Sequence, residues 1–94
     1  MVSLILFPMT FGTATVFARD LPPWAQFFAD RFCDYLRQGH SDVRSGELGA
    51  QDVLNSQYAA GFVAAYQGPR DAFEATVSEA LITTCPDDLD NANQ

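Results

Sequence analysis

The sequence feature that most limits the fold is an aromatic stripe between Pro22 and Gly39. Its members recur at helical spacing and are Trp24, Phe28, Phe32, Tyr35 and Leu36, with Phe27 broadening the stripe. Residues three and four positions apart lie on one face of an α-helix, so the stripe is typical of a helix with one buried face. Pro23 suits the first helical turn, and Gly39 suits the position after the last turn. The pattern therefore predicts a helix over residues 23–38.

Two later stretches show the same periodicity. Their apolar positions are Leu54, Tyr58, Phe62 and Ala65 in residues 50–67, and Phe73, Val77, Ala80 and Leu81 in residues 69–85. The dipeptide Gly68-Pro69 separates the two stretches, and Pro86 ends the second. The sequence therefore predicts a second and a third helix.

The segment between the first and second predicted helices is polar and contains Gly46 and Gly49. Glycine is a poor helix former, so a loop is expected here, with a short helical turn near residues 42–48. No alternation of apolar and polar residues suggests a β-strand. The expected fold class is all-α, a small bundle of three to four helices.

The first 18 residues carry no charged side chain. An apolar core from about Leu4 to Phe11, followed by short residues before Ala18, is typical of a secretory signal peptide cleaved after Ala18. No Lys or Arg precedes this core, and a retained membrane anchor or a part of the folded domain are the alternatives. The expected organisation is a signal peptide at 1–18, a single helical domain at 19–88 and a flexible acidic tail at 89–94. The mature protein is expected in the periplasm or secreted.

The chain contains two cysteines, Cys33 in the first predicted helix and Cys85 at the end of the third. An even number of cysteines in a short exported chain favours a disulfide, and a reduced buried pair is the alternative. Closing a loop of roughly 50 residues should stabilise the fold by about 4 kcal/mol. The predicted bundle is therefore stapled by one disulfide between Cys33 and Cys85.

The charge balance is strongly acidic. Twelve Asp and Glu residues face five Arg residues and no Lys, for a net charge of −7 at pH 7. Such a chain repels phosphate backbones and anionic lipid headgroups. We therefore expect no nucleic-acid partner, and no membrane contact for the mature form.

The polar residues do not form a recognisable catalytic or metal-binding pattern. The single histidine, His40, follows Cys33 by seven residues, and a Cys33–His40 dyad would need a reduced thiol in an oxidising compartment. One His and two Cys do not have zinc spacing. The acidic end of the chain lacks the glycine and closing glutamate of a calcium loop. We therefore expect a protein that is not an enzyme, with no metal and no cofactor.

Three short motifs follow one another along the chain, one in each predicted helix. Cys33-Asp34-Tyr35-Leu36 lies in the first predicted helix, Ala59-Ala60-Gly61-Phe62 in the second, and Cys85 at the end of the third. In this order they resemble the HdeA-like family of small periplasmic acid-stress chaperones, over about residues 32–88. The resemblance implies a disulfide-bonded helical fold. It also implies a homodimer at neutral pH that dissociates in acid and exposes apolar surface to denatured clients. Family members have lysine-rich termini, whereas this chain has no lysine.

Two functional hypotheses follow. The first is an exported stress chaperone that binds unfolded clients. The second is a non-enzymatic accessory subunit or inhibitor-type module that docks a periplasmic protein. The aromatic side chains are core by default and are the candidate binding surface when a helix is exposed. The candidate residues are Trp24, Phe27, Phe28, Phe32, Phe62 and Phe73.

Overall fold

A computed structural model of the chain describes residues 21–92, and its side chains are placed for residues 21–89. The predicted signal peptide lies outside this range, as do the last two residues of the predicted tail. Within the described range there are helices and no strands, which confirms the predicted all-α class. The helices are α2 (Pro23–Arg37), α3 (Asp42–Leu54), α4 (Ala59–Gln67), α5 (Arg70–Thr84) and α6 (Pro86–Ala92).

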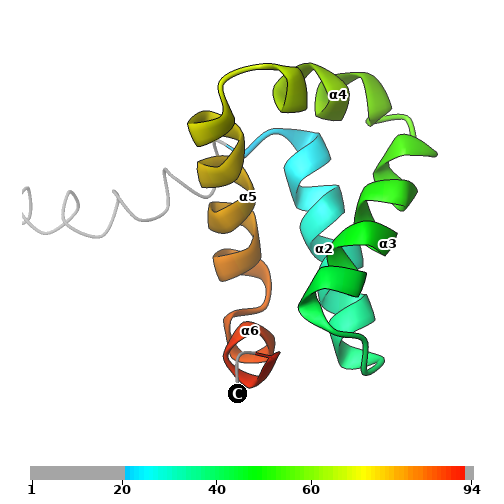
Figure 1. The fold of residues 1–94 in the computed structure, drawn as a ribbon, viewed down its shortest axis with the longest axis vertical. Coiled ribbons are helices and arrows are strands. Elements are labelled where there is room, and N and C mark those ends of the chain that lie inside the picture. Colours follow the sequence, from blue (N-terminus) through cyan, green and yellow to red (C-terminus); the bar gives the residue numbers. More distant parts are fainter. Residues whose placement is uncertain (1–20, 93–94) are drawn as a thin grey trace, which may run out of the picture.

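Helix α2 is the central element of the bundle. It lies between α3 and α5, while α4 crosses one end of the bundle and α6 closes the other (Figure 1). Its buried face carries Trp24, Phe28 and Phe32, as the aromatic stripe predicts. Every other helix described therefore packs against the aromatic face or the flanks of α2.

The end of α2 follows from Gly39, which has a positive φ of 101°. The amide of Gly39 donates to the carbonyl of Leu36 at 3.0 Å, and the amide of His40 donates to the carbonyl of Tyr35 at 3.1 Å. This pair of bonds is the Schellman motif, in which a left-handed glycine satisfies the last helical carbonyls. The predicted stop at Gly39 is confirmed.

Helix α3 occupies the segment that was expected to be a loop with a short helical turn near residues 42–48. The predicted loop is wrong, because the expected turn is the start of a full helix. Ser41 caps the helix by accepting a hydrogen bond from the amide of Arg44 at 3.1 Å. Ser45 and Gly49 are buried against α2, where a Cβ at Gly49 would lie 3.2 Å from Cε1 of Phe28. The glycines that lower helix propensity thus allow α3 to approach α2 closely, and this packing outweighs the propensity.

The single helix predicted over residues 50–67 is in fact two helices, which is a second correction. α3 ends at Leu54, and the chain turns before α4 begins at Ala59. In the turn, the hydroxyl of Ser56 donates to the carbonyl of Val53 at 2.6 Å and accepts from the amide of Tyr58 at 3.1 Å. A serine side chain that bonds to the backbone in this way competes with helical hydrogen bonds. The break lets α4 cross the start of α2, where Gly61 faces Trp24.

Helix α6 extends into the segment predicted as a flexible tail. It begins at Pro86, directly after the break at Cys85, and continues to Ala92. Leu89 packs against the hydrophobic core. The folded domain therefore continues past residue 88, where the predicted boundary lay.

Gly46 and Gly49 are expected to respond to substitution in opposite directions. A Cβ at Gly46 would lie 3.7 Å from Cε2 of Phe32, an ordinary contact, so Gly46→Ala should stabilise the fold by about 0.5–1 kcal/mol through helix propensity. Gly49→Val would push bulk into the ring of Phe28 and towards the backbone of Phe32, and should destabilise it by about 1–3 kcal/mol. Urea unfolding followed by far-UV circular dichroism measures both effects. Changes of the same sign would contradict the packing described for α3.

Candidate functional site

The structure gathers five of the six candidate binding residues into one aromatic cluster between α2, α4 and α5. Trp24 stacks on Phe73 of α5, with ring centroids 5.4 Å apart, and its ring meets Phe62 of α4 edge-on at 5.5 Å. The ring of Phe62 also lies 6.3 Å from that of Phe28. Phe28 continues the cluster to Phe32 at 5.8 Å. Three helices thus contribute to one continuous cluster.

These rings form the core of the folded protein. Trp24, Phe28, Phe32 and Phe62 are each no more than 9% exposed. Phe73 is half-buried and completes the cluster. Helices cover most of the surface of these rings in the folded protein, so contact of a client with the whole cluster would require helices to separate. The predicted binding role of these residues stays a prediction.

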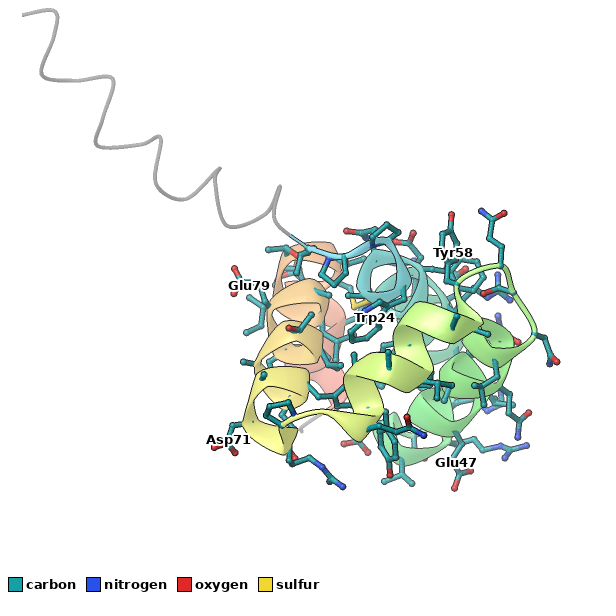
Figure 2. All side chains as sticks on the ribbon, turned by 90° about the horizontal axis from the view of Figure 1, so that it is seen from above. Trp24, Glu47, Tyr58, Asp71 and Glu79 are labelled. Atoms are coloured by element: carbon teal, nitrogen blue, oxygen red, sulfur yellow. A yellow bond between two sulfur atoms is a disulfide. The ribbon has the colours of Figure 1, made fainter. Side chains whose placement is uncertain are left out.

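The sixth candidate, Phe27, packs at the margin of the core. It is half-buried, and its ring packs against Tyr58 with centroids 5.3 Å apart. Tyr58 is the residue directly before α4, so this pair closes the bundle where the chain turns from α3 into α4. Figure 2 shows Tyr58 near the edge of the bundle and Trp24 inside it.

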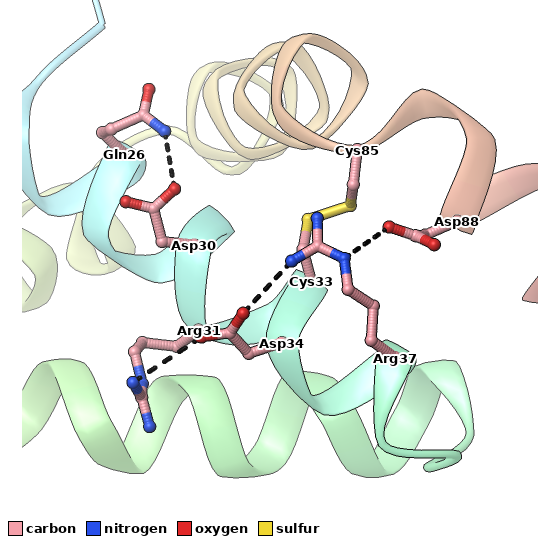
Figure 3. Close-up of polar contacts among 8 residues, drawn as sticks. All are labelled: Gln26, Asp30, Arg31, Cys33, Asp34, Arg37, Cys85 and Asp88. Carbon is pink, nitrogen blue, oxygen red and sulfur yellow. Dashed lines mark hydrogen bonds and ion pairs between the residues drawn. A yellow bond between two sulfur atoms is a disulfide. The ribbon is translucent and has the colours of Figure 1, made fainter.

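The predicted disulfide between Cys33 and Cys85 is present. Its two Cα atoms are 6.1 Å apart, and both cysteines are buried. Cys33 lies in the middle of α2, and Cys85 is the residue directly after α5 (Figure 3). The bond therefore fixes the C-terminal end of α5 to the central helix, and it leaves no thiol for a nucleophilic role.

A polar cluster that the sequence analysis did not predict fastens α3 to α2. Both Arg31 and Tyr35 donate hydrogen bonds to the same carboxylate oxygen of Asp52, which lies in the last turn of α3. The Nε–H of Arg31 donates to Oδ2 of Asp52 at 2.9 Å, and the hydroxyl of Tyr35 donates to it at 2.7 Å. The guanidinium of Arg31 also lies over the ring of Tyr35, 5.5 Å from its centroid. One ionised carboxylate thus holds two side chains of the neighbouring helix.

The environment of Asp52 makes this link sensitive to acid. Partial burial acts to raise the pKa of its carboxyl group. The hydrogen bonds from Tyr35 and Arg31 and the positive charge of Arg31 act to lower the pKa, and together they outweigh the effect of burial. The net pKa of Asp52 is below the usual aspartate value. A lowered pKa in the folded state means that ionised Asp52 favours folding.

A second ionic link joins α2 to α6 beside the disulfide. The Nε–H of Arg37 donates to Oδ2 of Asp88 at 3.0 Å, and its Nη1 donates to Asp34 at 3.1 Å (Figure 3). Arg37 is 52% exposed, so each pair contributes little by itself. The link from Arg37 to Asp88 has no signature in the sequence, because partners 51 residues apart leave no local pattern.

The surface also carries an apolar groove that no sequence pattern indicated. It has a volume of about 410 Å³ and lies between α3 and α4. Its lining residues are Ala50, Leu54, Phe62, Val63, Tyr66 and Gln67. The floor is Phe62 of the aromatic cluster, whereas Leu54, Val63 and Tyr66 are 49%, 36% and 54% exposed. The groove is thus open in the folded protein, unlike the cluster below it.

The described range contains no group of three or more His, Cys, Asp or Glu residues placed to hold a metal ion. Among the helices of residues 21–92, none combines the length and the apolar character that a bilayer span requires.

A comparison of the chain with protein-family models, with curated proteins and with solved structures found no match.

Proposed function

We propose that the protein is an exported, HdeA-like stress chaperone that binds unfolded clients with its aromatic cluster after acid has opened the bundle. The proposal includes no catalytic step. One observation carries it: α3 covers part of the cluster and is fastened to α2 by the carboxylate of Asp52, while a disulfide keeps α5 attached to the same helix.

Acid weakens the contact between α3 and α2 through Asp52. Its folded-state pKa is lower than its value in an unfolded chain, about 3.9. The unfolded chain therefore takes up the proton first, and the stability due to this group is present above about pH 4 and is lost as the pH falls through the folded-state pKa. Protonated Asp52 no longer forms an ion pair with Arg31.

The total charge acts in the same direction. At pH 7 the chain carries −7. When all twelve carboxylates and His40 are protonated, the five arginines and His40 leave a formal charge of +6. Repulsion between these charges favours an expanded state. The release of α3 and α4 would uncover Phe28, Phe32 and Phe62, which are now in contact with them or part of them.

The test is a pH titration of the oxidised protein with a hydrophobic dye and with an acid-denatured client. Dye fluorescence is expected to rise below about pH 4, together with suppression of client aggregation. Asp52→Asn removes the charge that holds Arg31, so its transition is expected at a higher pH than that of the wild type. A protein that stays closed in strong acid, or that opens without protecting the client, would contradict the proposal.

Asp30→Asn is the matched control for Asp52→Asn. Asp30 is exposed and accepts a hydrogen bond at 3.1 Å from Gln26, which belongs to the same helix. It makes no ion pair with an arginine of residues 21–92. Its substitution should leave the transition where it is, and an equal shift in both variants would assign the effect to net charge alone.

A second candidate function is an interaction module that docks a partner in its folded form. The observation that favours it is the open apolar groove between α3 and α4, which exposes Leu54, Val63 and Tyr66 without any unfolding. This function would operate at neutral pH, where the chaperone is closed.

A further inference from the structure

We infer that the groove between α3 and α4 binds an apolar segment of another protein that is flanked by arginine or lysine side chains. The inference rests on the second candidate function, docking in the folded form, and does not depend on acid opening. The occupant is assigned from three properties of the groove: its apolar lining, its acidic flanks and the state of the neighbouring arginines.

The lining of the groove fits aliphatic or aromatic anchors. Its volume of about 410 Å³ lies within the range of roughly 300–1,000 Å³ that is usual for binding pockets. Five of its six lining residues are apolar or aromatic, and Gln67 is the only amide among them. The floor residue Phe62 is fixed by contacts with Trp24 and Phe73, so the groove is preformed. An amphipathic helix with anchors at i, i+3 or i+4, and i+7 is a common occupant of such grooves.

The flanks of the groove are acidic. Glu47 lies on α3 one turn before the lining residue Ala50, and its side chain is 58% exposed. Asp71 follows the lining residue Gln67 by four positions and stands in the first turn of α5. Figure 2 shows Glu47 and Asp71 on either side of the C-terminal end of α4. Positive side chains at both ends of a bound segment would meet these carboxylates.

The arginines nearest to the groove are already paired within the chain. Arg44 binds Glu47 at 3.1 Å, and Arg70 lies 3.8 Å from Glu74 and over the ring of Tyr66. Asp71 has no ion pair with any arginine of the described residues. Both arginines are thus engaged with glutamates of their own helices, whereas the carboxylate of Asp71 is left for a basic partner.

The net charge of −7 also favours a basic partner over a second copy of this chain as the occupant of the groove. Two copies that met through this groove would bring like charges together, which opposes association. A basic segment gains from the same field, both in its rate of encounter and in specificity.

The experiment uses two fluorescein-labelled peptides of about 15 residues with the same leucine positions at helical spacing. One has lysine at both flanks and the other has glutamate. Fluorescence anisotropy at neutral pH and low salt is expected to show that the lysine peptide binds at least about tenfold more tightly than the glutamate peptide. Added salt should weaken the binding of the lysine peptide.

Variants locate the binding to the groove. Leu54→Ser combined with Val63→Ser should raise the Kd of the lysine peptide by about tenfold or more, since both side chains are anchors of the proposed site. Ile82→Ser is the matched control, because Ile82 is an apolar residue of α5 that is 59% exposed and lies outside the groove. It should leave the Kd within about twofold. All variants should keep the far-UV circular dichroism and melting temperature of the wild type, as the substituted residues are exposed.

Three results would overturn the inference. Equal affinity for both peptides would show that the acidic flanks do not select a basic segment. An unchanged Kd in the Leu54→Ser/Val63→Ser variant would show that the peptide binds outside the groove. A homodimer that this variant converts to a monomer, with no peptide bound by the wild type, would assign the groove to a second copy. Acid-dependent client protection measured on the same variants reports on the chaperone proposal separately, because it depends on the buried cluster.

Discussion

Replacing Cys33 and Cys85 together by alanine is expected to lower the free energy of unfolding by about 4 kcal/mol. The disulfide closes a loop with a sequence separation of 52 residues, and the unfolded chain regains the entropy of that loop when the bond is lost. For a domain of this size the change corresponds to a fall of about 15–30 °C in melting temperature. Thermal unfolding followed by far-UV circular dichroism measures it.

Reductant provides the control for the double alanine variant. Wild-type protein treated with reductant should lose most of the same stability, whereas the variant should not respond, because the sequence has no other cysteine. If the wild type melts at the same temperature with and without reductant, the disulfide does not stabilise the fold as described.

Trp24→Ala is expected to be the most damaging single substitution in the aromatic cluster, at about 3–5 kcal/mol. The ring is only 6% exposed and joins α4 and α5 to α2 through its contacts with Phe62 and Phe73. Its removal leaves a cavity at the point where three helices meet. Urea unfolding by circular dichroism is the suitable measurement, since Trp24 is the only tryptophan and the variant has no intrinsic tryptophan signal.

Tyr66→Ala is the control that tests whether burial or aromatic contact alone determines the cost in stability. Tyr66 also packs against Phe73, with centroids 5.4 Å apart, but it is 54% exposed. Its loss should cost less than about 1 kcal/mol. Equal costs for Tyr66→Ala and Trp24→Ala would show that the cluster is not the centre of the core.

Those parts of the fold that depend on local pattern could be predicted from the sequence. The stripe from Trp24 to Leu36 marked the buried face of α2, and Gly39 marked its end. The loop predicted before residue 50 was wrong because the effect of Gly46 and Gly49 depends on whether a neighbouring helix is present. Alone they lower helix propensity, but against Phe28 and Phe32 they permit close packing.

The candidate site was predictable only in part, for a related reason. The aromatic residues could be named one by one, and their meeting in one cluster follows from the packing of three periodic faces. The link from Asp52 to Arg31 and Tyr35 could not be named, because it requires the position of α3 relative to α2. The groove likewise depends on the break between Leu54 and Ala59, which contains neither glycine nor proline.

The position of the disulfide has a further consequence for recovery after stress. Because Cys33 lies in α2 and Cys85 directly follows α5, the disulfide joins α3, α4 and α5 into one covalent ring with the last third of α2. If acid separates these helices as proposed, the ring remains closed and α3 stays within a short tether of the face of α2 on which it packs. Much of the entropy of bringing distant segments together is therefore already lost before refolding begins. On the proposed function, we expect neutralisation to restore the native packing rapidly and without help.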